Sequence, residues 1–229
     1  MARQRPPDRF GQILDAATRV FGAKGLERAK MSDIASEAGV SQGTLYNYVE
    51  SKEALFGLLL DRGLGAPLPE PQAQPMASPT PEALAQRMDE AIAASFSLPR
   101  LDEALRRRRV TDAKGELAGV IDELFERTEA TRQAADVLER SAFEVPHLAA
   151  VFYGKVRRGL LDRLGELIRK RAAAGHYRSP DPKILARMIV ENVTTFARHI
   201  HHDIEPPGFD LGDARRVVVE TLVAGVVAR

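Results

Sequence analysis

The stretch that decides the fold is Met31–Lys52, which reads MSDIASEAGVSQGTLYNYVESK. Apolar residues three and four positions apart predict two short helices, separated at Gly39-Val40-Ser41. Gly39 permits a left-handed turn, and Ser41 is placed to cap the second helix, which we expect to run to about Tyr48. Ser51 is placed to cap a further helix, so the stretch predicts helix, tight turn, helix and the start of another.

The pair of short helices has an apolar side and a polar side. The apolar positions, which we expect to pack against the first helix of the chain and lock the pair together, are Ile34, Ala35, Val40 and Leu45. The positions left facing outward are Gln42, Gly43, Thr44, Tyr46 and Asn47. Because this face carries hydrogen-bonding groups and no acid, it suits the major groove of DNA, and the stretch is a candidate helix-turn-helix. The alternative is a packing motif whose tyrosines are half-buried core residues.

The same periodicity extends in both directions from this stretch. A stripe from Phe10 to Phe21 predicts a first helix that stops at Gly25, and leucines after Ser51 predict a helix that breaks at Gly63 and Gly65. Residues 65–81 contain six prolines, which favours a linker. Helical stripes then resume, including one from Pro146 to Gly175. We therefore predict an all-α fold with an N-terminal domain at 1–64, a Pro-rich linker at 65–81 and a helical domain at 82–229.

Composition restricts the class of protein without naming one. The chain has 229 residues, of which 44% are hydrophobic and 28% charged, as in an ordinary globular protein. The absence of cysteine excludes disulfides, thiolate zinc sites and cysteine nucleophiles. No stretch suggests a signal peptide or a membrane span, so we expect a cytoplasmic location and no membrane partner. Net charge is only +1, and residues 1–65 carry nine basic against eight acidic residues, so any DNA contact must come from locally placed groups.

The segment Asp33–Leu55 closely resembles the signature of the TetR family of bacterial regulators, and the resemblance extends back over Ile13–Ala17 and Phe21–Gly25. It implies that Gln42, Gly43 and Tyr46 face bases. It also implies that phosphates are held by Thr44, Asn47, Tyr48 and Lys52, and we add Ser41 and Lys30 to the predicted DNA-binding set. Lys30 and Met31 stand near the point where the family usually has a phosphate-binding threonine, so Lys30 is expected to replace that contact electrostatically. For Tyr48, a packing role is an equal alternative.

The resemblance also implies what the remaining helices do. The last two, Lys183 to His202 and Leu211 to Ala228, are expected to form a homodimer that binds palindromic double-stranded operator DNA. A small-molecule effector is expected to enter the C-terminal domain and release the DNA, which makes the chain a repressor without a cofactor. The candidate lining residues are Phe96, Phe125, Phe143, His147, Phe152, Asn192, Phe196 and His199. The alternative for each is an ordinary place in a helical core.

Two charged clusters admit more than one interpretation. The histidines 199, 201 and 202 with Asp203 suggest a metal site, but histidines near the end of a helix also interact favourably with its dipole, and we predict no metal. The run Arg106–Arg109 suggests nucleic-acid binding, but nearby acids favour an ion-paired surface. Two rival functions stay open: a constitutive or architectural DNA-binding factor without effector, and an enzyme that uses the histidines or Glu191. No nucleophile-and-base spacing supports the enzyme.

Overall fold

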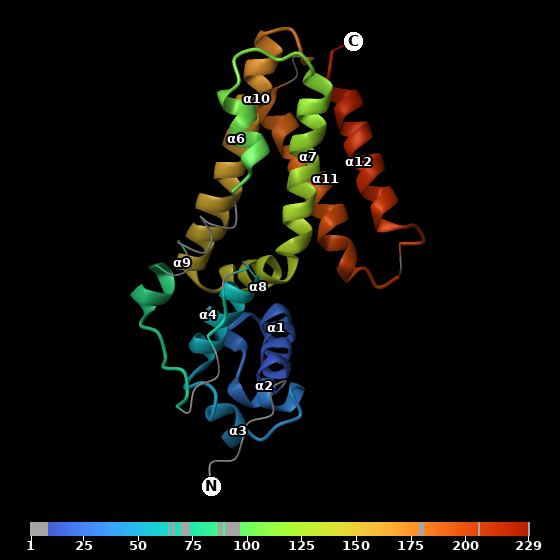
Figure 1. Cartoon of the computed structure of the whole chain (residues 1–229). Helices are drawn as coiled ribbons and strands as arrows, with labels where there is room; N and C mark the ends of the chain where they lie inside the picture. Colours follow the sequence, from blue (N-terminus) through green and yellow to red (C-terminus); the bar gives the residue numbers. More distant parts are fainter. Residues whose placement is uncertain are drawn as a thin grey trace. The chain divides into compact units, whose positions relative to one another are not determined.

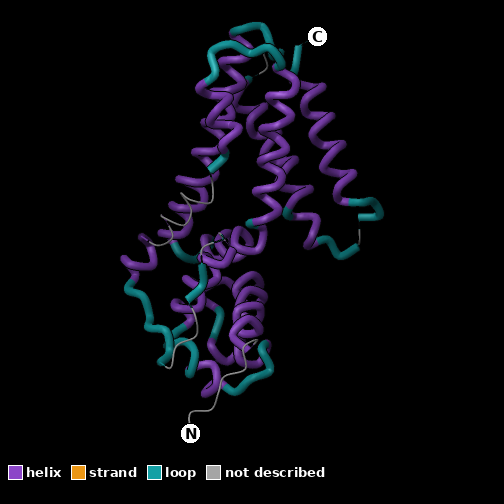
Figure 2. Tube along the Cα trace, in the orientation of Figure 1, coloured by secondary structure: helices purple, strands orange, loops and turns teal. Residues whose placement is uncertain are grey.

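The computed structural model describes residues 9–63, 65, 67–69, 74–86, 89, 97–178, 181–205 and 207–228. Within these ranges the chain is built from helices and connecting loops, as Figure 2 shows, with two isolated β-bridges, so the all-α prediction is confirmed. No helix in the described part of the chain is both long and apolar enough to cross a membrane.

The chain packs as two compact units (Figure 1). Unit 1 comprises Met1–Ser95 together with Gln133–Lys155, and unit 2 comprises Phe96–Arg132 together with Val156–Arg229. The segment 133–155 is therefore far from the N-terminal helices in sequence but packs with them. The domain boundaries that the sequence predicts, at 64 and 81, stay a prediction. The two units are defined by contacts between residues, and each combines two separate segments of the chain.

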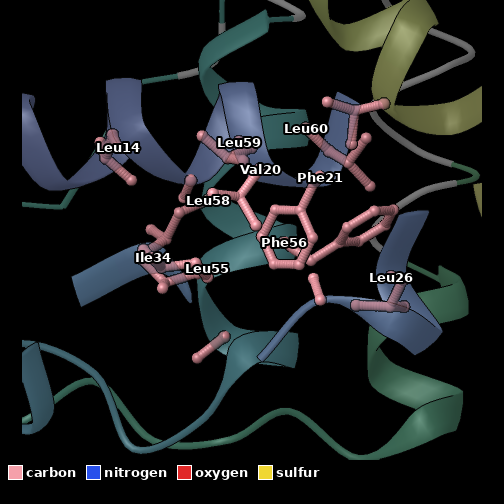
Figure 3. Close-up of a cluster of buried hydrophobic side chains, with 14 of the residues drawn as sticks. Leu14, Val20, Phe21, Leu26, Ile34, Leu55, Phe56, Leu58, Leu59 and Leu60 are labelled. Atoms are coloured by element: carbon pink, nitrogen blue, oxygen red, sulfur yellow. The ribbon is translucent and has the colours of Figure 1, made fainter. Parts of the chain in front are cut away.

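Unit 1 is organised around the first helix. Its helices are α1 (Arg9–Arg28), α2 (Met31–Glu37), α3 (Gln42–Tyr46), α4 (Lys52–Gly63), most of α8 (Arg132–Ala142) and α9 (Pro146–Ala149). Side chains of α1, α2 and α4 converge in one apolar core (Figure 3). At its centre the rings of Phe21 and Phe56 meet edge to face, with centroids 5.5 Å apart. Val137, Leu138 and Ala142 of α8 complete the same core.

Unit 2 is a bundle of longer helices. They are α6 (Pro99–Arg106), α7 (Ala113–Ala130), α10 (Arg158–Ala173), α11 (Pro182–Ala197) and α12 (Leu211–Val226). A π-helical segment, η1 (Ala150–Arg157), leads into α10, although its residues up to Lys155 belong to unit 1, and a 3-10 turn, η2 (His199–His202), follows α11. Helix α11 packs against α7, α10 and α12, so the core of this unit forms around it.

A buried ion pair joins two elements of unit 2. The guanidinium of Arg171 and the carboxylate of Glu116 lie 2.6 Å apart, and each side chain is only 4% exposed. Arg171 also donates to the Ala104 carbonyl at the end of α6. A buried cation is stable only when it is paired and hydrogen-bonded, and this one satisfies both conditions while holding the end of α6 against α10.

Candidate nucleic-acid interface

The turn between α2 and α3 has the geometry that the sequence predicts. Gly39 adopts φ +63°, and Val40 donates its backbone N–H to the Ala35 carbonyl at 2.9 Å. Ser41 then caps α3, because its hydroxyl accepts the backbone N–H of Thr44 at 3.1 Å. A positive φ is costly for residues with a side chain, so glycine at position 39 fixes the angle at which α3 leaves α2.

Helix α3 presents one apolar and one polar face. Leu45 is fully buried, whereas Tyr46 is 44% exposed. Four other predicted contact residues are also exposed, namely Ser41, Gln42, Gly43 and Asn47. Thr44 is half-buried, and its hydroxyl shares a hydrogen bond with the Ser41 hydroxyl at 2.9 Å. The structure thus brings the predicted polar residues of α3 together on an accessible surface of unit 1.

Tyr48 and Lys52 serve the packing of the domain itself. The Tyr48 side chain is 4% exposed, and its ring stacks on Phe10 with centroids 5.9 Å apart. The Lys52 ammonium donates to the carbonyls of Leu26 at 2.9 Å and Glu27 at 3.0 Å, near the end of α1. Sequence reasoning missed this cap on α1, because no local pattern reports that two segments 25 residues apart meet. The phosphate contacts of both residues stay predictions.

Lys30 stands at the start of α2 and is exposed. Its backbone N–H donates to the Asp33 carboxylate at 3.1 Å, and the Lys24 ammonium lies 2.9 Å from the same group. These interactions lower the pKa of Asp33 below its ordinary value, and the hydrogen bond from Lys24 is the largest cause. Lys30 therefore stands next to an acid whose charge Lys24 already balances, at the edge of the helix-turn-helix.

Ser141 of α8 and Glu144, which follows this helix, bind the end of α1. The Leu26 backbone N–H donates to the Ser141 hydroxyl at 3.0 Å in a buried contact, and Arg28 pairs with Glu144 at 2.6 Å. Gly25, with φ +78° and ψ 170°, breaks the helix at this point and leaves the Leu26 N–H without a partner inside α1. Ser141 was not singled out from the sequence, where one serine on an amphipathic stripe carries no signal.

The predicted effector residues are divided between the two units. In unit 1, Phe152 is buried, whereas Phe143 and His147 are exposed. In unit 2, Phe125 is buried in the core and Phe196 packs against its edge. The effector site stays a prediction, and Phe96 lies outside the described residues.

Of the polar residues in the predicted effector set, Asn192 bonds to its own helix and His199 is exposed. Asn192 donates its side-chain amide to the Met188 carbonyl at 2.8 Å, so its helix supplies the partner that a polar group on an apolar stripe needs. His199, His201 and His202 are all exposed. In the described part of the chain, no group of three or more histidine or acidic residues is arranged to hold a metal ion.

The arginine run is partly ion-paired. Arg107 forms a salt bridge with Glu103 and lies 3.9 Å from Glu116, as the neighbouring acids predict. Arg106, Arg108 and Arg109 are exposed. The run lies at the end of α6 in unit 2, and the helix-turn-helix belongs to unit 1.

Comparison with known proteins places the N-terminal helices in a family. Residues 13–59 match the sequence model described as bacterial regulatory proteins, tetR family. An uncharacterized HTH-type transcriptional regulator of Bacillus subtilis, YvdT, is 49% identical over 48 residues, which is 21% of this chain and 25% of YvdT. The chain spans between about a quarter and a third of the length of the curated relatives that it matches first.

Solved structures resemble the chain over all or nearly all of its length, among them two regulators. The ketosteroid transcriptional regulator KstR2 of Mycobacterium tuberculosis gives a TM-score of 0.60 at 17% identity, with all of both chains covered. AibR, solved in complex with isovaleryl coenzyme A and operator DNA, gives 0.56 at 16% identity, covering 94% of this chain and 96% of AibR. At such identity the likeness shows the fold, so the helical C-terminal half has the architecture of these regulators.

Proposed function

Residues 13–59 belong to the tetR family of bacterial regulatory proteins, and from this premise we propose that the whole chain is a ligand-responsive transcriptional repressor. It binds palindromic operator DNA as a homodimer, and a small molecule releases it. Relatives that are 44% and 49% identical over the matched residues are HTH-type transcriptional regulators, which supports a regulatory role.

One observation carries the DNA-binding part of the proposal. Helix α3 buries Leu45 completely and leaves Gln42, Gly43 and Tyr46 exposed. Glutamine can bond bidentately to adenine, and tyrosine can contact thymine methyl groups or phosphate. Because the neighbouring glycine carries no side chain, the backbone of α3 can approach a base pair closely.

The test is a gel-shift titration against the DNA upstream of the gene, with a duplex enriched from a random library by the wild-type protein as a second probe. Gln42→Ala and Tyr46→Ala are expected to weaken binding about tenfold each, since one good base contact contributes about 1–3 kcal/mol. Glu27→Ala, an exposed change away from α3, serves as the control. Unchanged affinity in both α3 variants would exclude α3 as the reading helix.

The contacts around Gly25 supply a route for the effector response. Because Ser141 and Glu144 hold α1 from a segment that follows α7, a shift of that segment would strain the domain that carries α3. A ligand changes DNA affinity only if it binds the two states unequally, typically by 1–3 kcal/mol. We therefore propose that the coupling runs through the contact of α8, and of the turn after it, with α1.

Screening metabolites for release of bound DNA tests the effector part. The panel includes acyl-coenzyme A thioesters, because a solved neighbour of the same fold holds isovaleryl coenzyme A. Release by one compound, together with a reciprocal loss of its affinity in the presence of DNA, is the expected result. Stable DNA binding in the presence of every compound would favour the constitutive factor instead.

A further inference from the structure

The proline-rich segment does not simply connect two domains. Residues 74–80, which we call the strap, return to the turn that follows α3 (Figure 1). Met76 forms an isolated parallel bridge with Val49, in which the Met76 N–H donates to the Tyr48 carbonyl at 2.8 Å. The Glu50 N–H donates to the Met76 carbonyl at 3.0 Å, so both backbone groups of Met76 are used.

Side chains strengthen this attachment. The Glu50 carboxylate accepts the Ser78 backbone N–H at 3.1 Å. Met76 is half-buried and packs against the core of unit 1, as does Leu68 before it. Pro75 and Pro79 restrict the chain within the strap, which lowers the entropy that is lost when it is fixed.

The turn that the strap contacts determines where α3 points. Helix α3 has five residues, so it has few hydrogen bonds of its own and depends on its ends for orientation. Ser41 fixes the first end. The other end continues into Tyr48, Val49 and Glu50, and the strap bonds to the first and third of these.

We propose that the strap is a positioning element of the DNA-binding domain, which holds the C-terminal end of α3 at the angle that sequence-specific binding needs. The inference rests on the proposed function. Met76 and Glu50 are then positioning residues, and neither needs to touch DNA. The strap should favour specific over non-specific DNA, because non-specific binding depends on phosphate contacts and tolerates a change in the angle of α3.

A pair of substitutions at Glu50 separates this role from electrostatics. Glu50→Ala and Glu50→Gln both remove a negative charge beside α3, which by itself strengthens binding to any DNA. Only glutamine keeps a side-chain oxygen that can accept the Ser78 N–H. On a duplex enriched from a random library by the wild-type protein, we expect Glu50→Ala to bind about fivefold more weakly than Glu50→Gln, the effect of one hydrogen bond. On poly(dI-dC) the two variants should bind alike.

Two controls complete the experiment. Glu27→Ala and Glu27→Gln change an exposed acid of the same domain and should not differ on either DNA. Met76→Gly should lower affinity for the enriched duplex in the same way as Glu50→Ala, whereas Gln74→Ala, at an exposed position of the strap, should not.

Hydrogen exchange of the free protein tests the attachment without DNA. The amides of Met76, Glu50 and Ser78 should exchange more slowly than in an unstructured peptide of the same sequence. Unprotected amides, or equal affinities of the two Glu50 variants for the enriched duplex, would overturn the strap while leaving the regulator proposal standing. If the wild-type protein enriches no duplex at all, the proposed function fails and the DNA role of the strap fails with it, even where the amides are protected.

Discussion

The Lys52 ammonium lies among backbone carbonyls near the end of α1, a place where unpaired carbonyls attract a cation. Lys52→Met keeps the apolar stem and removes the donor, so we expect the free energy of unfolding of unit 1 to fall by about 2 kcal/mol. Chemical denaturation measures the change. Arg19→Ala breaks only an exposed ion pair with Glu37 and should cost about 0.5 kcal/mol. Equal losses would show that Lys52 contributes no more than a surface charge.

Tyr177 is a buried residue whose hydroxyl has no hydrogen-bond partner in the described part of the chain. Its side chain is 3% exposed, and burial raises the pKa of the phenol above its ordinary value. Tyr177→Phe removes a polar group that is desolvated without compensation, so the free energy of unfolding should rise by about 1 kcal/mol. Tyr46→Phe, on an exposed ring, should leave it unchanged. A marked loss of stability in Tyr177→Phe would mean that the hydroxyl is bonded in solution.

At the scale of elements, the break in α1 at Gly25 depends on glycine. Its φ and ψ lie in a region that other residues rarely adopt, and an added Cβ would lie 3.2 Å from the Glu144 carboxylate. Gly25→Ala should therefore destabilise unit 1 by about 2 kcal/mol. Gly22→Ala lies in the same helix with nothing within 4 Å, and should instead stabilise it by about 0.5–1 kcal/mol. Thermal unfolding of the two variants should move in opposite directions.

Elements whose signals are local could be predicted from the sequence. The turn at Gly39 and the caps at Ser41 and Ser51 are confirmed, because each depends on residues within four positions of one another. The resemblance seen in Asp33–Leu55 is confirmed by the family match over 13–59. On α3, the exposure of Gln42 and the burial of Leu45 follow from helical periodicity.

Elements that depend on distant partners could not be predicted. The sequence predicts a penultimate helix that reaches His202, but α11 ends at Ala197, because Arg198 leaves the helical conformation (φ −133°) and a 3-10 turn follows. The sequence predicts a linker where the strap lies, because the hydrogen bonds from the strap to Tyr48 and Glu50 join backbone groups and do not require particular side chains. The predicted effector residues are mostly aromatic, and aromatic side chains on helices fill a core with the same periodicity as they line a pocket.

At the scale of the whole molecule, the last two helices expose apolar side chains. Ile184 is 62% exposed and Met188 51% exposed on α11, and Val217 is 51% exposed on α12. Ile184 and Met188 are four residues apart, so they lie on one face of their helix. Burial of such side chains against a second copy gains about 25 cal/mol for each Å² of apolar surface, which supports α11 and α12 as the dimer interface that we propose.

Charged substitutions on these helices test that interface. We expect Met188→Asp with Val217→Asp to convert a dimer into a monomer in sedimentation velocity at micromolar concentration, because each carboxylate would lose its hydration in the interface. Ile204→Asp is the matched control, since this isoleucine is fully exposed but lies on neither helix. The monomer should keep its helical circular dichroism. It should lose most operator affinity, because its single α3 reaches one half-site, whereas a dimer reaches two half-sites that are about 34 Å apart. A double variant that stays dimeric would place the interface elsewhere.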